Sequence, residues 1–234
     1  MLEPERAPTQ LYLISPPQID LDVFAPLLEE ALTASPKTVG SFQLRLKQKD
    51  VPPPPGRLTH AHAAEEMTLY AAKILKRICH AHEVAFILND NALLALEANA
   101  DGVHLGQEDG SIAAARELLG PDKVIGVSCH ASRHLAMEAG EQSADYVAFG
   151  AFHATTSKTA EALEKYGTPQ TEILEWWSSL TTLPCVAIGG MTPQNCRPMV
   201  KAGADFIAAL TGVWNHPQGP AQAVREFAKS FAEL

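Results

Sequence analysis

The sequence lacks the patterns that mark secreted, redox or zinc-binding proteins. Its 234 residues include only four cysteines, and no two of them form a C-x-x-C pair, which argues against a zinc knuckle or a dithiol redox motif. We expect these cysteines to be small buried residues of a protein that works in a reducing compartment. They are Cys79, Cys129, Cys185 and Cys196.

Long apolar segments are also missing. No run approaches the ~18 uncharged apolar residues that a transmembrane helix needs. The first ten residues contain no apolar segment typical of a signal peptide. We therefore expect a cytoplasmic protein without a membrane partner. The hydrophobic residues, 46% of the chain, exclude a disordered protein.

Positive charge is scarce. The chain has 18 Lys and Arg against 27 Asp and Glu, for a net charge of −9. This balance argues against nucleic acid or an anionic membrane surface as a partner. Such a chain binds phosphate only where its few cations converge.

What the sequence does contain is a regular alternation of short apolar runs and longer helix-like stretches. The runs are bounded by Gly, Pro or Asp, which is typical of strands buried on both faces of a parallel sheet. Eight such units predict an α/β fold, a single (β/α)8 TIM barrel over residues 11–234 that follows a flexible segment 1–10. An open doubly wound sheet is the alternative, although no G-x-G-x-x-G motif follows a strand. The eight runs are 11–15, 41–46, 84–88, 102–105, 124–128, 145–150, 184–190 and 205–210.

Helix starts and one loop stand out between these runs. Ser111, Ser132 and Thr192 each precede a helix-like stretch and are predicted N-caps. Four consecutive prolines, residues 52–55, follow the second run and cannot lie inside a helix. We interpret them as a surface insertion, with part of an active-site lid as the alternative.

Polar residues at the end of the second strand form the first candidate site. Gln43, Arg45 and Lys47 alternate and therefore point to one side of the strand. At the mouth of a barrel they would make a cationic wall suited to a phosphate or pyrophosphate. The alternative is a solvated strand end without a ligand.

Acidic residues follow the next two strands. Asn89 and Asp90 end the third strand, and Asp109 lies just beyond the fourth. Two carboxylates on neighbouring loops fit Mg²⁺, which takes one or two carboxylates together with water and phosphate oxygens. The alternative is that both aspartates are helix caps.

A serine and a histidine follow the fifth strand. No G-x-S-x-G elbow surrounds Ser128 and no acidic partner is apparent, so we interpret it as a hydrogen-bond donor to a phosphate rather than as a nucleophile. His130 is either a general acid or base or an ordinary hydrogen-bonded histidine.

The last three strands are followed by residues that can bind anions. Hydroxyl and ammonium donors follow the sixth strand, and glycine-containing turns follow the seventh and eighth, where barrels often bind phosphate. A polar surface loop and simple tight turns are the alternatives. Two anion sites at one mouth suit an enzyme that joins two phosphorylated substrates. The donors after the sixth strand are Thr155, Thr156, Ser157 and Lys158, and the second site uses the backbone of Gly189, Gly190, Leu210 and Thr211.

These motifs also resemble a known family. QLRLK, ND, ADGVHLGQED, IGVSCH, DYVAFGAF, TTSK and AIGGMTPQN are similar to thiamine-phosphate synthase in both content and order, from about Leu11 to Trp214. The resemblance implies a (β/α)8 barrel with Mg²⁺ as cofactor. It implies the condensation of 4-amino-2-methyl-5-(diphosphooxymethyl)pyrimidine with thiazole phosphate, giving thiamine phosphate and pyrophosphate.

The resemblance also implies residue roles. Gln43, Arg45 and Lys47 would hold the pyrimidine diphosphate, and Asn89 and Ser128 would add hydrogen bonds. Asp90 and Asp109 would be the Mg²⁺ ligands. Lys158 would reach the pyrophosphate, which makes Arg45, Lys47, Ser128 and Lys158 the expected catalytic set. The thiazole phosphate would contact Thr155, Ser157, Gly189, Gly190, Leu210 and Thr211, and Thr156 would be a further substrate-binding residue.

The chain also departs from the family pattern. Asn91 stands where the family usually has Arg, which removes a cation, and Ala151 and Ala154 replace prolines beside an unusual His153. Three alternatives therefore stay open: a thiazole tautomerase, a barrel that binds thiazole or thiamine phosphate without turnover, and a class I aldolase with Lys47 or Lys158 as Schiff base. We also expect that the protein could form a homo-oligomer.

Overall fold

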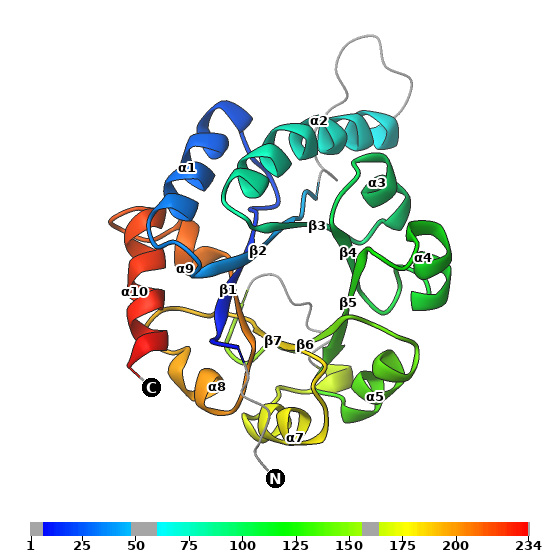
Figure 1. The fold of residues 1–234 in the computed structure, drawn as a ribbon, viewed down its shortest axis with the longest axis vertical. Helices are drawn as coiled ribbons and strands as arrows, with labels where there is room; N and C mark the ends of the chain where they lie inside the picture. The colour runs from blue at the N-terminus through cyan, green and yellow to red at the C-terminus, as the bar shows by residue number, and fades with distance from the viewer. Residues whose placement is uncertain (1–6, 48–59, 156–163, 234) are drawn as a thin grey trace.

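Eight parallel strands close into a barrel in the order β1 to β8, and helices surround it (Figure 1). The computed structural model describes residues 7–47, 60–155 and 164–233. The predicted (β/α)8 barrel is confirmed, and the open doubly wound sheet is wrong. The strands are β1 (Gln10–Ile14), β2 (Val39–Leu44), β3 (Ala85–Asn89), β4 (Gly102–Leu105), β5 (Val124–His130), β6 (Tyr146–Gly150), β7 (Cys185–Ile188) and β8 (Phe206–Ala209).

The helices connect successive strands on the outside of the barrel, and α10 closes the ring by packing against α1. Among the described residues no helix combines the length and apolarity that crossing a bilayer requires. The helices are α1 (Leu21–Thr33), α2 (His60–Ala81), α3 (Ala92–Glu97), α4 (Ile112–Leu119), α5 (Arg133–Glu141), α7 (Glu172–Leu180), α8 (Arg197–Lys201), α9 (Thr211–Trp214) and α10 (Pro220–Ala232).

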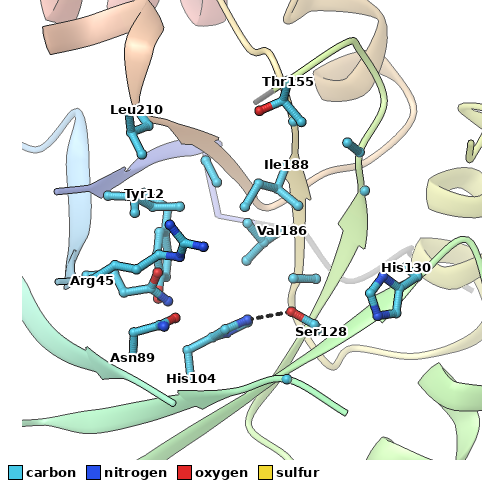
Figure 2. Close-up of a pocket in the computed structure, with 18 of the residues that line it drawn as sticks. Tyr12, Arg45, Asn89, His104, Ser128, His130, Thr155, Val186, Ile188 and Leu210 are labelled. Carbon is cyan, nitrogen blue, oxygen red and sulfur yellow. Dashed lines mark hydrogen bonds between the residues drawn. The ribbon is translucent and has the colours of Figure 1, made fainter. Parts of the chain in front are cut away.

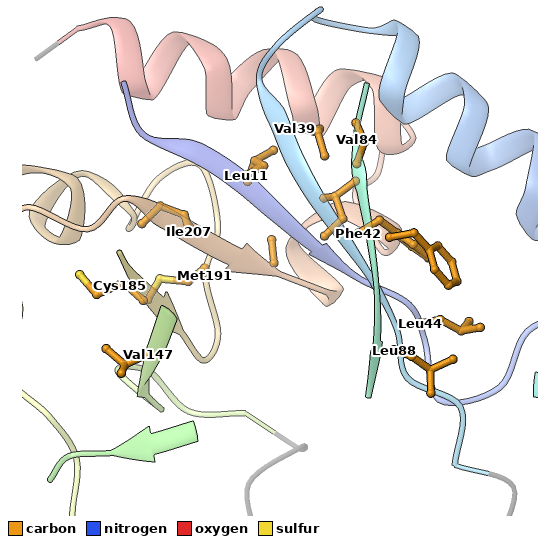
Figure 3. Close-up of a cluster of buried hydrophobic side chains, with 14 of the residues drawn as sticks. Leu11, Val39, Phe42, Leu44, Val84, Leu88, Val147, Cys185, Met191 and Ile207 are labelled. Carbon is orange, nitrogen blue, oxygen red and sulfur yellow. The ribbon is translucent and has the colours of Figure 1, made fainter. Parts of the chain in front are cut away.

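Each strand buries both of its faces. Residues such as Leu11, Phe42 and Val147 point outward and pack under the helices in the main apolar core (Figure 3). Their neighbours, such as Tyr12 and Ala148, point inward and fill the barrel. Because successive side chains alternate, this double burial explains why the strands read as nearly continuous apolar runs.

Three aspartates close the rim at which the strands begin. Each follows an alanine and stands immediately before β4, β6 or β8. Asp101 accepts the backbone N–H of Phe86, and Asp145 accepts that of Ile125. Asp205 does the same for the first residue of β7. Each carboxylate thus binds a backbone donor of the preceding strand and fixes where neighbouring strands meet.

Two of the three predicted helix starts are confirmed. Ser111 and Ser132 cap α4 and α5 by accepting backbone N–H groups with their hydroxyl oxygens. The prediction for Thr192 is wrong, because α8 begins at Arg197. The Asn195 side chain accepts the Thr192 N–H and donates to the Gly190 carbonyl, so this segment closes a turn instead of a helix.

The cysteine prediction agrees with the structure. All four cysteines are free and buried. Burial raises the pKa of the Cys129 thiol to about 12 and that of Cys196 to about 11, which keeps both thiols protonated and unreactive. The proline run 52–55 lies outside the described residues.

Removing one rim aspartate should destabilise the barrel. Asp145→Ala loses the bond to the Ile125 N–H and the 2.6 Å contact with Arg116. We expect a loss of about 1–3 kcal/mol in the free energy of unfolding, measured by urea denaturation, because a backbone donor is left unpaired. Asp122→Ala is the matched control: this exposed residue should change the value by less than about 0.5 kcal/mol. Equal effects of the two substitutions would refute the role of the rim aspartate.

Candidate active site

A cavity of about 540 Å³ opens at the carboxyl ends of the strands. Its size lies within the range of small-molecule sites. Figure 2 shows Tyr12, Arg45 and Asn89 approaching from one side, and Ser128 and His130 from the other. Thr156, Ser157 and Lys158 lie outside the described residues. All the other predicted site residues line the cavity: Gln43, Arg45, Lys47, Asn89, Asp90, Asp109, Ser128, Thr155, Gly189, Gly190, Leu210 and Thr211.

The cationic wall continues past the end of β2. The Arg45 N–H donates to the Ser15 hydroxyl at 2.9 Å, and the Lys47 N–H donates to the Pro17 carbonyl at 2.8 Å. The segment after β1 therefore holds both basic residues at the mouth. Burial lowers the pKa of Arg45 while nearby Asp90 opposes that shift, so the guanidinium faces the acidic residues in a partly dehydrated setting. Gln43 lies deeper, with only 3% of its surface exposed.

Asp90 and Asp109 form a carboxyl pair opposite these cations. The Asp90 N–H donates to the His104 carbonyl, and Asp109 closes a short turn by accepting the Gly106 N–H at 2.7 Å. The two carboxyl groups lie close enough to affect each other's charge. Burial first, and then the negative charge of Asp109, raise the pKa of Asp90 to about 6.

Neither aspartate is a helix cap. The N-caps of α3 and α4 are Asn91 and Ser111. Within the described part of the chain, no three His, Cys, Asp or Glu side chains gather into a metal cluster. A hard cation held by two carboxylates, water and substrate oxygens remains compatible with that finding, and two carboxyl groups forced together suit such a cation.

The structure gives a physical reason for the asparagine that departs from the family pattern. The Asn91 side chain accepts the Leu94 N–H at 3.0 Å and caps α3. Its oxygen is therefore occupied by the helix. The residue begins the helix that follows Asp90 and is not among the residues that line the cavity.

An irregular pairing places the residues at the end of β5. The register with β6 shifts between Ser128 and His130. Cys129 is buried outside the barrel while its two neighbours both line the cavity, as the alternation of side chains along a strand requires. His130 stacks flat on Tyr166, with ring centroids 4.2 Å apart. Tyr166 and Lys165 also line the cavity, and sequence reasoning missed both of them.

The glycine pair after β7 allows a close approach of two loops. Gly189 and Gly190 have φ values of 107° and 60°. A Cβ on Gly189 would lie 2.3 Å from that of Ala151, and one on Gly190 would lie 2.7 Å from the Ala154 carbonyl oxygen. Only glycine fits this backbone. The loops after β6 and β7 can therefore pack together beside Leu210 and Thr211.

Sequence reasoning also missed the floor of the cavity. Tyr12, His104 and Tyr146 line it and are buried. Burial lowers the pKa of His104 to about 4, so its imidazole is neutral near pH 7. A signal existed, because each of these residues interrupts an apolar strand at an inward position, as Tyr12 does between Leu11 and Leu13.

Comparison with known proteins decides the family. Residues 11–213 match the model of a family described as thiamine monophosphate synthase. The chain belongs to this family. Among curated relatives, the thiamine-phosphate synthase of Erythrobacter litoralis is 50% identical over 228 residues, 96% of each chain. That of Rhodospirillum centenum is 49% identical over 218 residues, 93% of this chain and 95% of its own.

A solved structure agrees with the family assignment. Thiamine phosphate pyrophosphorylase from Pyrococcus furiosus superposes with a TM-score of 0.76 and 27% identity over 96% of both chains. The resemblance to the thiamine-phosphate synthase family that the motifs indicated is therefore confirmed over nearly the whole barrel.

The raised pKa of Asp90 predicts a pH-dependent cost to the fold. The folded state holds this proton more tightly than the unfolded chain, so stability falls as pH rises from about 4 to 6. In metal-free protein at pH 7.5, Asp90→Asn should therefore raise the melting temperature by roughly 2–4 °C, about 1 kcal/mol after solvent screening. At pH 4 the gain should vanish, because the wild-type carboxyl is then protonated. If Asp90→Asn raised the melting temperature equally at both pH values, the ionised Asp90 carboxylate would not be the cause. Asp122→Asn is the control and should leave the melting temperature unchanged.

Proposed function

We propose that the protein is a thiamine-phosphate synthase that joins the pyrimidine diphosphate to thiazole phosphate and releases pyrophosphate. The observation that carries the proposal is one cavity with two different anion-binding sides. Cations and a carboxyl pair line one side, and close-packed glycine turns line the other. An enzyme that joins two phosphorylated substrates needs both sides at once.

The first side fits the diphosphate. Arg45 and Lys47 would neutralise its charge, and Asn89 and Ser128 would donate hydrogen bonds to that substrate. Gln43, which is buried and lines the cavity, would contact the pyrimidine ring. Lys158 is proposed as a further pyrophosphate contact from the resemblance alone.

Asp90 and Asp109 would hold the Mg²⁺ ion. The raised pKa of Asp90, which comes from burial and from the charge of Asp109, supports this assignment, since a cation would relieve the repulsion between the two carboxylates. When bound, Mg²⁺ would supply further neutralisation of charge on the diphosphate. Arg45 and Lys47 lie near the same pair, so anionic and cationic groups would surround the leaving group together.

The second side fits the thiazole phosphate. The backbone at Gly189, Gly190, Leu210 and Thr211 and the hydroxyl of Thr155 line it. Backbone N–H groups and hydroxyls bind phosphate without adding charge. We place Thr156 and Ser157 there from the resemblance.

The reaction needs alignment more than acid or base. The bond between the pyrimidine CH2 carbon and the diphosphate oxygen breaks, and pyrophosphate leaves with the electron pair. The aminopyrimidine stabilises the resulting cation, and the thiazole nitrogen then forms the new C–N bond. Arg45 and Lys47 stabilise charge on the departing oxygens, while the cavity walls hold the two rings in line.

We also propose that the protein works in the cytoplasm. Four buried free cysteines suit a reducing compartment.

Turnover is the decisive test of the proposed function. We expect pyrophosphate release, with thiamine phosphate detected by mass spectrometry, only when both substrates and Mg²⁺ are present, and none after addition of a chelator. Binding of thiazole phosphate without pyrophosphate release would instead favour an isomerase of that substrate or a binding protein without turnover.

A substitution in the carboxyl pair tests the metal assignment. Asp90→Asn should lower kcat/KM at limiting Mg²⁺ at least 100-fold, about 2.7 kcal/mol of transition-state stabilisation. Part of the loss should return at high Mg²⁺, because the remaining carboxylate still binds the ion weakly. Asp122→Asn should leave turnover unchanged. Equal Mg²⁺ dependence of Asp90→Asn and wild type would remove Asp90 from the metal site.

A further inference from the structure

A chain of hydrogen bonds crosses the floor of the barrel beneath the cavity. The Gln43 amide nitrogen donates to the Tyr12 hydroxyl at 3.1 Å, and the Tyr12 and Tyr146 hydroxyls are 2.8 Å apart. The Tyr146 hydroxyl lies 2.9 Å from His104 Nδ1, and His104 Nε2 lies 2.9 Å from Ser128 Oγ (Figure 2). Five strands supply these five residues: β1, β2, β4, β5 and β6.

This chain of hydrogen bonds differs from the usual interior of a (β/α)8 barrel, which is filled by branched apolar side chains. The two tyrosines and His104 are buried, at 3, 7 and 8% exposure. Burying their polar groups costs free energy unless each finds a partner. Each does, and the rings also pack, with the His104 and Tyr146 centroids 5.6 Å apart. The hydrogen-bonded chain ends at Gln43 and at Ser128, and both residues line the proposed pyrimidine side of the cavity.

The Gln43 amide gives the direction of these hydrogen bonds, because its nitrogen donates to the Tyr12 hydroxyl. The Tyr12 proton is then available to Tyr146, the other partner of this hydroxyl among the described residues. The Tyr146 proton then goes to His104 Nδ1, which places the imidazole proton on Nε2. Nε2 donates to Ser128 Oγ, and the Ser128 hydroxyl proton is left for the cavity.

We propose that Tyr12, Tyr146 and His104 are positioning residues that set the hydrogen-bonding polarity of both ends of the pyrimidine side. With its nitrogen bound to Tyr12, Gln43 presents its carbonyl oxygen as an acceptor, which suits an N–H donor such as a ring amino group. Ser128 is turned into a donor, which suits an anionic oxygen. The inference rests on the proposed function for its substrate, but the direction of the chain rests on the structure alone.

The polarity is tested by reading the His104 tautomer directly. In long-range ¹H–¹⁵N spectra of the full-length protein, we expect the Nε2–H form at neutral pH. Tyr146→Phe removes the hydroxyl bonded to Nδ1 and should shift that nitrogen signal, whereas Tyr70→Phe, an exposed tyrosine on α2, should not. An Nδ1–H tautomer in the wild type would overturn the proposed direction, whether or not the protein shows turnover.

The positioning role is tested by a double-mutant cycle. Tyr146→Phe should lower kcat/KM for the pyrimidine diphosphate about tenfold, the value of one buried hydrogen bond, without raising KM for thiazole phosphate. In a Ser128→Ala background the same change should cost less than about twofold, because Tyr146 acts on Ser128 through His104, whereas Gln43 stays bound to Tyr12. A purely structural role predicts equal costs in both backgrounds and would overturn the proposal.

Two further measurements keep the outcomes distinct. Tyr12→Phe, which leaves His104 and Ser128 in place, should reproduce the selective loss if Tyr146→Phe fails to fold. If the wild type shows no turnover, the proposed function fails, and the same cycle is measured on the affinity for the pyrimidine diphosphate. No coupling in that affinity would overturn the positioning role as well.

Discussion

The alternation of side chains along eight closed strands is the constraint on which the rest of the structure depends. In each strand, one residue packs under the helices and the next faces the barrel axis. The outward positions, such as Leu13 and Phe42, accept only apolar side chains because the helices cover them. The inward positions meet three environments in turn, namely the rim where the strands begin, the floor, and the mouth. Stability and chemistry therefore occupy alternate residues of the same short segments.

That constraint explains why much of the fold and part of the site could be predicted. Parallel strands all end at one rim, so residues that follow different strands meet there without any knowledge of register. Arg45, Asp90 and Ser128 could be placed at one cavity on this basis alone. The repeated alanine-aspartate starts of β4, β6 and β8 reflect the same regularity at the opposite rim.

What could not be predicted depends on contacts around the barrel. Tyr12 and Tyr146 are 134 residues apart, and their hydroxyls meet only because β1 and β6 turn both rings to the same height. Local competition explains the other failures. Thr192 has the composition of a helix start, but the Asn195 side chain binds its N–H and closes a turn. Asn91, interpreted as a lost cation, has its oxygen engaged by the end of α3.

The closed barrel that brings the site residues together also forces two acidic side chains close to each other, which costs free energy of folding. Burial and the negative charge of Asp109 raise the pKa of Asp90 at the mouth, so the ionised carboxylate destabilises the unliganded fold. The floor meets the opposite demand, since its hydroxyls and its imidazole are paired one after another. The charges at the mouth are not fully neutralised, so they can bind charged ligands. The polar groups of the floor are all hydrogen-bonded to one another, so they are held in a single arrangement. A rigid floor beneath an electrostatically unsatisfied mouth is the arrangement expected of a catalyst that acts by holding two substrates in line and neutralising a leaving anion.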